Sequence, residues 1–219
     1  MLLKVEDKLQ ERFPGLSAHV GMVRGLEIVR ELSELEEFKS EVFQRARERW
    51  TLDQLREEET FRAYRDFFWR MGVDPTKIRP ASEALLRRVL RGRPLPVINT
   101  FVDAYNLASV ETAIPLAAFD EDQLSGPLLM RTAEAGEFFL GIGMGKPVEL
   151  KGEEAVVDDG EKLVAIYPYR DADACKITTS TRNALMLFCG VPNIGGSILR
   201  DAGRVAVDYV TRFCGGAEA

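Results

Sequence analysis

The sequence predicts an α+β fold in a single domain, in which helices come first, strands follow and one helix closes the chain. Apolar residues recur at helical spacing over most of the chain before position 112. After position 115, short apolar runs separated by Gly, Pro and Asp are typical of strands. Helices and strands are segregated rather than alternating, which argues against a doubly wound parallel sheet. A chain of 219 residues is long enough for a substantial core.

The first half of the sequence carries one strand pattern and four helical patterns. Partial alternation of apolar and polar residues predicts a strand over 17–28. The spacing of apolar residues predicts helices over 33–50, 51–72, 80–91 and 97–112. Thr51 and Gln54 form the capping box expected at the start of the second of these helices, and Gly72 ends it.

The second half of the sequence predicts a series of short strands and a closing helix. The strands are expected over 128–132, 137–142, 155–157, 162–168, 175–178 and 184–189, and the helix over 194–213. The glycine-rich stretch 141–146 has the spacing of neither a dinucleotide fingerprint nor a P-loop. It therefore predicts a tight turn between strands.

Composition excludes several classes of protein. The chain has one histidine, His19, and three cysteines without a C-x-x-C pair, so we expect no zinc site, no other metal and no cofactor. The cysteines are expected to be reduced thiols in a cytoplasmic protein. No apolar run approaches 18 residues, so we expect neither a membrane span nor a secretory signal.

The charge of the chain is unevenly distributed. Its net charge is −6, yet residues 45–93 hold 13 basic residues against 8 acidic ones. Arg62 and Arg65 are about one helical turn apart, as are Arg87 and Arg91. These four arginines would suit transient contact with an RNA backbone. The alternative is an ordinary solvated surface, with the arginines paired to neighbouring glutamates.

Two clusters of polar residues are candidates for a site. Asn99, Asp103 and Asn106 lie at i, i+4 and i+7, so a helix would place them on one face, as a buried structural network or as the lining of a pocket. The segment 167–173, followed by Lys176, places aromatics, a cation and two carboxylates at one strand exit. That segment would bind an amine together with a carboxyl or phosphate group, or would form a turn capped by its aspartates.

Several of these motifs also occur together in a known family. The sequence I-R-P-A-S-E at 78–83 is followed by N-x-x-x-D-x-x-N at 99–106, P-L-x-A-F-D at 115–120 and R-x-A-x-x-G-E at 131–137. In this order and spacing they resemble the editing domain, also called the B3/4 domain, of the phenylalanyl-tRNA synthetase beta subunit. The resemblance covers roughly residues 77–191.

The resemblance implies a layered αβ sandwich of the editing-domain type with a pocket between sheet and helices. It divides the single domain 1–219 into an N-terminal strand and helical extension (1–76), an editing-domain-like core (77–191) and a C-terminal helix (192–219). In the synthetase, this domain hydrolyses the ester between tRNA and a wrongly attached amino acid, which is the chemistry of a second sieve. Free-standing relatives resemble trans-editing factors.

Three positions depart from the synthetase pattern. Ala117 stands where the synthetase has His, Tyr105 where it has Thr, and Leu187 where it has Glu. The pocket therefore differs from that of the synthetase, and its specificity for aromatic amino acids is not expected here. Four carboxylates would instead favour a substrate with a cationic side chain, namely Asp103, Glu111, Asp171 and Asp173.

These observations give two main hypotheses for function and a weaker third one. The first is a trans-acting aminoacyl-tRNA deacylase, in which Asp103 or Asp171 activates water. Its substrate-binding residues would be Asn99, Tyr105, Asn106, Glu111, Ala117, Tyr169, Arg170, Asp173 and Lys176. Its transient partner would be tRNA, held by Arg62, Arg65, Arg87 and Arg91. The second is a module that binds RNA or a small molecule without hydrolysis, and the third is a purely structural interaction protein.

Overall fold

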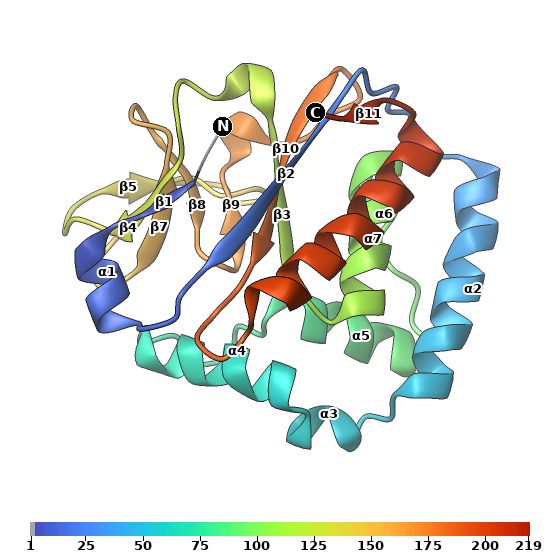
Figure 1. Cartoon of the computed structure of the whole chain (residues 1–219), viewed down its shortest axis with the longest axis horizontal. Coiled ribbons are helices and arrows are strands. Elements are labelled where there is room, and N and C mark those ends of the chain that lie inside the picture. The colour runs from blue at the N-terminus through green and yellow to red at the C-terminus, as the bar shows by residue number, and fades with distance from the viewer. Residues whose placement is uncertain (1–2) are drawn as a thin grey trace.

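A computed structural model describes residues 3–219 as two packed β-sheets with helices covering one of them (Figure 1). In the four-stranded sheet the order is β11 (Ala217–Glu218), β2 (Ala18–Arg24), β10 (Asn183–Cys189) and β3 (Leu116–Asp120). In the five-stranded sheet it is β1 (Lys4–Val5), β4 (Leu129–Thr132), β7 (Ala155–Asp158), β8 (Leu163–Ile166) and β9 (Arg170–Asp171). A separate hairpin joins β5 (Phe138–Phe139) to β6 (Val148–Glu149).

Strand β10 shows how the layers are built. It is buried on both faces, and its side chains alternate between two cores. Leu185, Leu187 and Cys189 join the core between the two sheets. Met186 and Phe188 join the core between the four-stranded sheet and the helices. The four-stranded sheet is therefore the middle layer of the molecule.

The helices occupy two positions relative to that middle layer (Figure 1). Its outer face is covered by α2 (Ser33–Arg49), α5 (Ala81–Leu90), α6 (Thr100–Thr112) and α7 (Gly196–Cys214). The core between the sheets is closed at one end by α1 (Asp7–Arg12) and α4 (Glu59–Arg70), with α3 (Gln54–Glu57) leading into α4. Tyr64 of α4 reaches across to donate a hydrogen bond to the Cys189 carbonyl at 2.5 Å. None of the helices in residues 3–219 combines the length and apolar content needed to cross a membrane.

Much of the predicted element order is confirmed. The helices at 33–49, 81–90 and 196–214, and the strands at 18–24 and 183–189, lie where hydrophobic periodicity predicted them. The glycine-rich stretch 141–146 lies in the connection between β5 and β6, as expected of a turn. The capping box is also present, because Gln54 donates its backbone N–H to Thr51 Oγ1 at 3.3 Å and the Thr51 N–H donates to Gln54 Oε1 at 2.8 Å.

Several predicted elements are wrong in extent or type. The helix expected over 51–72 is interrupted at Glu58, whose ψ of 124° is extended rather than helical. No strand was expected over Leu116–Asp120, which forms strand β3. Both its faces are buried, so it shows no alternation of apolar and polar residues. The strand expected over 175–178 is absent, because residue 175 ends a 3₁₀ turn over 173–175 and residues 176–178 form no strand. The strand expected over 137–142 is only two residues long.

Residues of the motifs that carry the family resemblance form ion pairs and hydrogen bonds within this fold. Arg131 donates to both carboxylate oxygens of Glu137, at 2.9 and 2.7 Å, and also pairs with Asp158. Asp120 accepts a hydrogen bond from Thr181 Oγ1 at 2.6 Å. Between the last two motifs, a Cβ on Gly126 would lie 2.8 Å from the backbone oxygen of Asp159, so a side chain cannot be accommodated there without a shift. These motifs therefore specify the fold rather than the chemistry.

Candidate functional site

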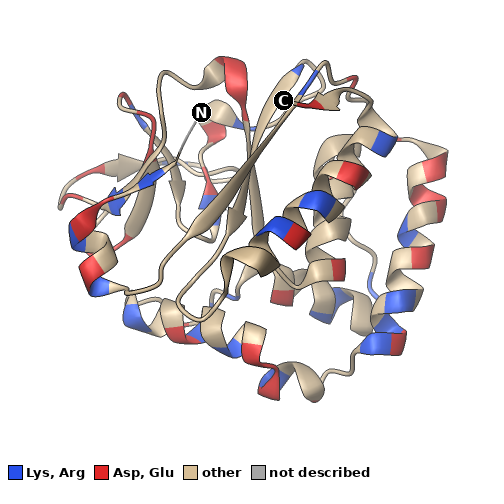
Figure 2. Ribbon diagram, viewed as in Figure 1, with Lys and Arg blue, Asp and Glu red and all other residues tan. Residues whose placement is uncertain are grey.

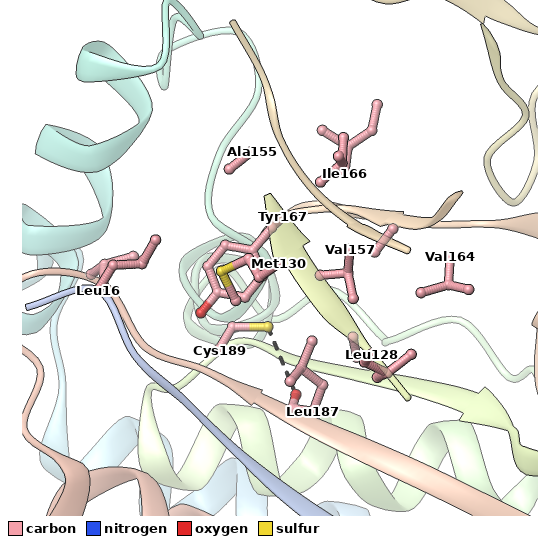
Figure 3. Packing of buried hydrophobic residues seen from close by; sticks show 14 of the residues in the cluster. Leu16, Leu128, Met130, Ala155, Val157, Val164, Ile166, Tyr167, Leu187 and Cys189 are labelled. Carbon is pink, nitrogen blue, oxygen red and sulfur yellow. Dashed lines mark hydrogen bonds between the residues drawn. The ribbon is translucent and has the colours of Figure 1, made fainter. Parts of the chain in front are cut away.

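The two positions where the synthetase pattern has His and Glu are occupied by packed apolar side chains. Ala117 on β3 lies directly opposite Leu187 on β10 in the antiparallel ladder. Both belong to the core between the sheets, and Leu187 is fully buried. Figure 3 shows Leu187 packed in this core near Tyr167, Met130 and Cys189. The inter-sheet face of the middle layer therefore offers no polar group at these two positions.

Asp103 is held in a buried ion pair. Lys39 of α2 donates to its carboxylate at 2.9 Å, and the Ile98 backbone N–H donates at 3.1 Å. Burial raises the pKa of Asp103, and the hydrogen bond from Lys39 opposes that rise. Lys39 was not among the predicted site residues, because a lysine within a helix of mixed charge gives no sign in the sequence that it is buried. The pair ties α2 to α6.

The predicted polar row is only partly present. Asn99 precedes α6 as its N-cap, where its side chain accepts a hydrogen bond from the Val102 N–H at 2.9 Å. Its amide also donates to the Ile177 carbonyl at 3.4 Å. Because Asn99 is not helical, the expected i, i+4, i+7 row does not form. Asn106, within α6, is partly buried and has no side-chain hydrogen bond to any residue of the described chain.

Asp171 has a different environment. It lies on β9, next to the edge strand β3, and its carboxylate accepts a hydrogen bond from the Ala118 N–H. Burial raises the pKa of Asp171 to about 7, although that hydrogen bond and the charge of Arg170 both lower it. Asp171 is only partly buried. Within residues 3–219 no lysine or arginine forms an ion pair with it.

Tyr105 of α6 is influenced by the charge of the same carboxylate. Burial, and secondarily the charges of Asp171 and Asp103, raise its pKa, so its hydroxyl stays protonated at neutral pH. The hydroxyl makes no hydrogen bond to another residue of the described chain. Asp171 thus combines a raised pKa with a place beside Ala118 of β3, and Tyr105 adds a hydroxyl that no described residue binds.

Two other predicted carboxylates are paired with cations of their own. Glu111 pairs with Arg45 at 3.1 Å, and Asp173 pairs with Lys176 at 2.7 Å. Asp103 is likewise paired, with Lys39. Of the four carboxylates that were expected to bind a cationic side chain of the substrate, only Asp171 therefore has no ion pair within residues 3–219.

The remaining predicted residues of the 167–173 segment lie in separate places. Tyr169 packs against Phe68, with ring centroids 5.8 Å apart, at the margin of the inter-sheet core. Arg170 is exposed and lies across Gly141, where a Cβ would come within 2.5 Å of its side chain, and it donates to the Ile142 carbonyl at 3.2 Å. Both contribute to packing around β9.

The four predicted RNA-binding arginines come together on one surface. Arg62, Arg65, Arg87 and Arg91 all line a concavity of about 780 Å³ formed by α3, α4, α5 and the segment between α4 and α5. Arg56, Arg79 and Trp69 line it too. The prediction missed these three, although the basic composition of residues 45–93 was a signal for the two arginines. Figure 2 shows acidic residues interspersed among the basic ones along α3 and α4.

The part of the chain that the structure describes contains no group of three His, Cys, Asp or Glu side chains placed to hold a metal ion. Asp171 offers a carboxyl group and Tyr105 a phenol.

Comparison with known protein sequences identifies a family for most of the chain. The family model described as the B3/4 domain matches residues 63–208. The phenylalanine–tRNA ligase beta subunit of Moorella thermoacetica is 33% identical over 144 residues, which are 64% of this chain and 17% of that protein. The corresponding subunit of Ureaplasma parvum is 30% identical over 98 residues, or 45% of this chain and 13% of that protein. The matched region is thus a small part of these relatives.

A solved structure also resembles the whole chain. An N-terminal fragment of the phenylalanyl-tRNA synthetase beta subunit from Pyrococcus horikoshii superposes with a TM-score of 0.54 at 14% identity. The alignment covers 99% of this chain and 49% of the fragment, and at that identity it supports the fold alone. Because the family model spans well over half of the sequence, the chain belongs to the B3/4 domain family.

Proposed function

We propose that this chain is a trans-acting deacylase that hydrolyses the ester between a non-cognate amino acid and tRNA. The relatives it resembles are subunits of a tRNA ligase, and hydrolysis of a mischarged product is the way to gain selectivity that binding alone cannot supply. The observation that carries the proposal is Asp171, a carboxyl group whose pKa of about 7 suits proton transfer at neutral pH. The proposed enzyme would encounter its substrate in the cytoplasm, where amino acids are attached to tRNA.

In this proposal Asp171 acts as the general base. Its carboxylate takes a proton from a water molecule while the water oxygen attacks the carbonyl carbon of the ester. The tetrahedral intermediate then collapses, the bond from the carbonyl carbon to the ribose oxygen breaks, and the proton passes from Asp171 to the leaving ribose oxygen. The products are a free amino acid and uncharged tRNA, so atoms and protons balance.

Tyr105 supplies the second group in the proposed mechanism. Because its hydroxyl is protonated and uncommitted, it can donate a hydrogen bond to the oxygen that becomes negative in the tetrahedral intermediate. Asp103 is assigned a structural part, because its carboxylate is already bound by Lys39. Asn106 remains a candidate for binding the amino acid, since its amide is unpartnered among the described residues.

A second candidate function is a binding module without hydrolysis. The specific observation in its favour is that Ala117 and Leu187 replace both polar residues of the synthetase pattern and pack into a core. A protein of this kind would hold charged or uncharged tRNA and leave the ester intact.

A deacylation screen separates the two candidates. The full chain is incubated with total tRNA charged with each amino acid in turn, including basic amino acids and non-protein analogues, and loss of the ester is followed. The proposal expects rapid hydrolysis of one class of ester and a loss of that activity in Asp171→Asn. Retained tRNA binding with no hydrolysis of any ester would refute the deacylase and favour the binding module.

A further inference from the structure

We propose that the concavity formed by α3, α4 and α5 is an RNA-docking site, in which arginines hold the sugar–phosphate backbone and Trp69 stacks on an unpaired base. The identity of the RNA as tRNA rests on the proposed function, whereas the existence of the site does not. The site is separate from the residues assigned to hydrolysis.

The first observation is the concentration of guanidinium groups. Six arginines line the concavity: Arg56, Arg62, Arg65, Arg79, Arg87 and Arg91. Only three acidic residues share the lining, namely Asp53, Glu57 and Glu83. The lining is therefore positive although the chain as a whole has a net charge of −6. A positive concavity on an acidic protein attracts a polyanion to that one face.

The second observation is that most of these arginines are free to bind. Arg56, Arg62, Arg79 and Arg91 are exposed, and within residues 3–219 none of them forms an ion pair. Their guanidinium groups present parallel N–H donors of the geometry that suits phosphate oxygens. Because no protein carboxylate must be released first, binding of a phosphate costs little in lost contacts.

The third observation is that the two remaining arginines are held in place by one buried carboxylate. Glu83 is only 1% exposed, and its Oε1 accepts from Arg65 Nη1 at 3.2 Å and from Arg87 Nε at 2.7 Å. Arg65 also donates to the Arg56 carbonyl at 2.7 Å. The terminal nitrogens of Arg87 are not used by any described residue, so they remain available to a ligand. Glu83 is thus a positioning residue for the concavity.

The fourth observation decides between kinds of polyanion. Trp69, at the end of α4, is 56% exposed and has no aromatic or cationic partner among the described residues. A large exposed ring in a basic concavity is what stacking on a nucleic-acid base requires. Neither an acidic peptide nor a free phosphate ion has a base to stack, so RNA fits the whole lining better than either of them.

The test measures binding of uncharged tRNA to the full chain over a series of salt concentrations. Arg62→Gln with Arg79→Gln removes two exposed charges from the concavity. The matched control, Arg30→Gln with Arg204→Gln, removes two exposed charges elsewhere. We expect the concavity variant to bind at least tenfold more weakly, with a slope of log affinity against log salt reduced by one to two units, about 0.9 per lost phosphate contact. The control should bind within twofold of the unmodified chain.

A second pair of variants tests stacking. Trp69→Ala should weaken binding of a single-stranded oligoribonucleotide about fivefold or more, and Trp69→Phe should retain most of the affinity. Equal weakening in the concavity variant and its control would overturn the proposal. So would competition by poly-glutamate as effective as that by RNA, which indicates an acidic protein partner, or displacement by millimolar inorganic phosphate, which indicates a simple anion site.

Failure of this proposal is distinguishable from failure of the deacylase. The binding assay uses uncharged RNA and needs no hydrolysis, so Asp171→Asn should bind RNA as the unmodified chain does. Loss of binding in the concavity variant, in a chain that hydrolyses no ester, would support the docking site and refute only the proposed reaction.

Discussion

Ala117 and Leu187 face each other across two antiparallel strands, at the positions where the synthetase pattern has His and Glu. Both side chains are buried in the core between the sheets. The proposed deacylase uses other groups: Asp171, which forms no ion pair within residues 3–219, and Tyr105, whose hydroxyl makes no hydrogen bond to a described residue.

Leu187→Ala tests whether this part of the fold is a filled core. Leu187 is fully buried, so the truncation removes apolar contacts and leaves a cavity. We expect the free energy of unfolding to fall by about 2–5 kcal/mol. Urea unfolding followed by circular dichroism measures it. A loss below about 1 kcal/mol would mean that the position opens onto solvent rather than core.

Breaking the Lys39–Asp103 pair tests the structural part assigned to Asp103. Asp103→Asn leaves the buried ammonium of Lys39 with only Glu36 as partner, which should cost about 3 kcal/mol of stability. The double variant Lys39→Met with Asp103→Leu should recover part of that loss, because it removes both buried charges. If Asp103→Asn stayed fully stable and yet abolished ester hydrolysis, Asp103 would be the base instead of Asp171.

The ionisation of Asp171 should make the free energy of unfolding depend on pH, and the sign of that dependence identifies this residue. Its pKa of about 7 in the folded chain is above the value near 3.9 that is usual for an unfolded aspartate. The folded state therefore binds the proton more tightly, and stability is lost as the pH rises from about 4 through about 7. Asp171→Asn mimics the neutral acid. We expect the variant to exceed the unmodified chain in stability above pH 7, by up to about 4 kcal/mol, and to match it near pH 4. A variant less stable than the unmodified chain at pH 8 would contradict this.

Glu83→Gln tests whether the buried carboxylate of Glu83 holds Arg65 and Arg87 in place in the arginine concavity. The substitution leaves Arg65 and Arg87 without their shared carboxylate, at a site that is 1% exposed. We expect thermal unfolding at a lower temperature, from a loss of about 3 kcal/mol. Glu57→Gln is the matched control, because Glu57 is exposed on the same surface and should change stability by less than about 0.5 kcal/mol. Equal stability of the two variants would show that the Glu83 carboxylate is not needed for the stability of the fold.

The sequence predicts the fold best where hydrophobic periodicity is strong. Helices α2, α5 and α7 have one apolar face each, and their bounds are confirmed to within a few residues. Strand β3 could not be found in this way, because burial on both faces removes the alternation that marks a strand. The break at Glu58 was equally hidden, since neither Gly nor Pro marks it.

The site is less predictable, because its assembly depends on long-range packing. The motif N-x-x-x-D-x-x-N indicated polar residues on α6, but Asn99 serves as a helix cap and Asp103 pairs with Lys39, which is 64 residues away in the chain. The absence of an ion pair at Asp171 within residues 3–219 is visible only in the structure. The arginine pairs were identifiable from helical spacing, whereas Trp69 could not be told from a core residue.

The most direct test of the central claim is a pH–rate profile of ester hydrolysis for the unmodified chain and for Asp171→Asn, on whichever aminoacyl-tRNA the screen identifies. If Asp171 is the base, the rate of the unmodified chain should rise with pH and level off above about pH 7, as the carboxyl group loses its proton. Asp171→Asn should be at least tenfold slower, about 1.4 kcal/mol of barrier, and should lack that inflection. An unchanged rate and an unchanged profile in the variant would contradict the account.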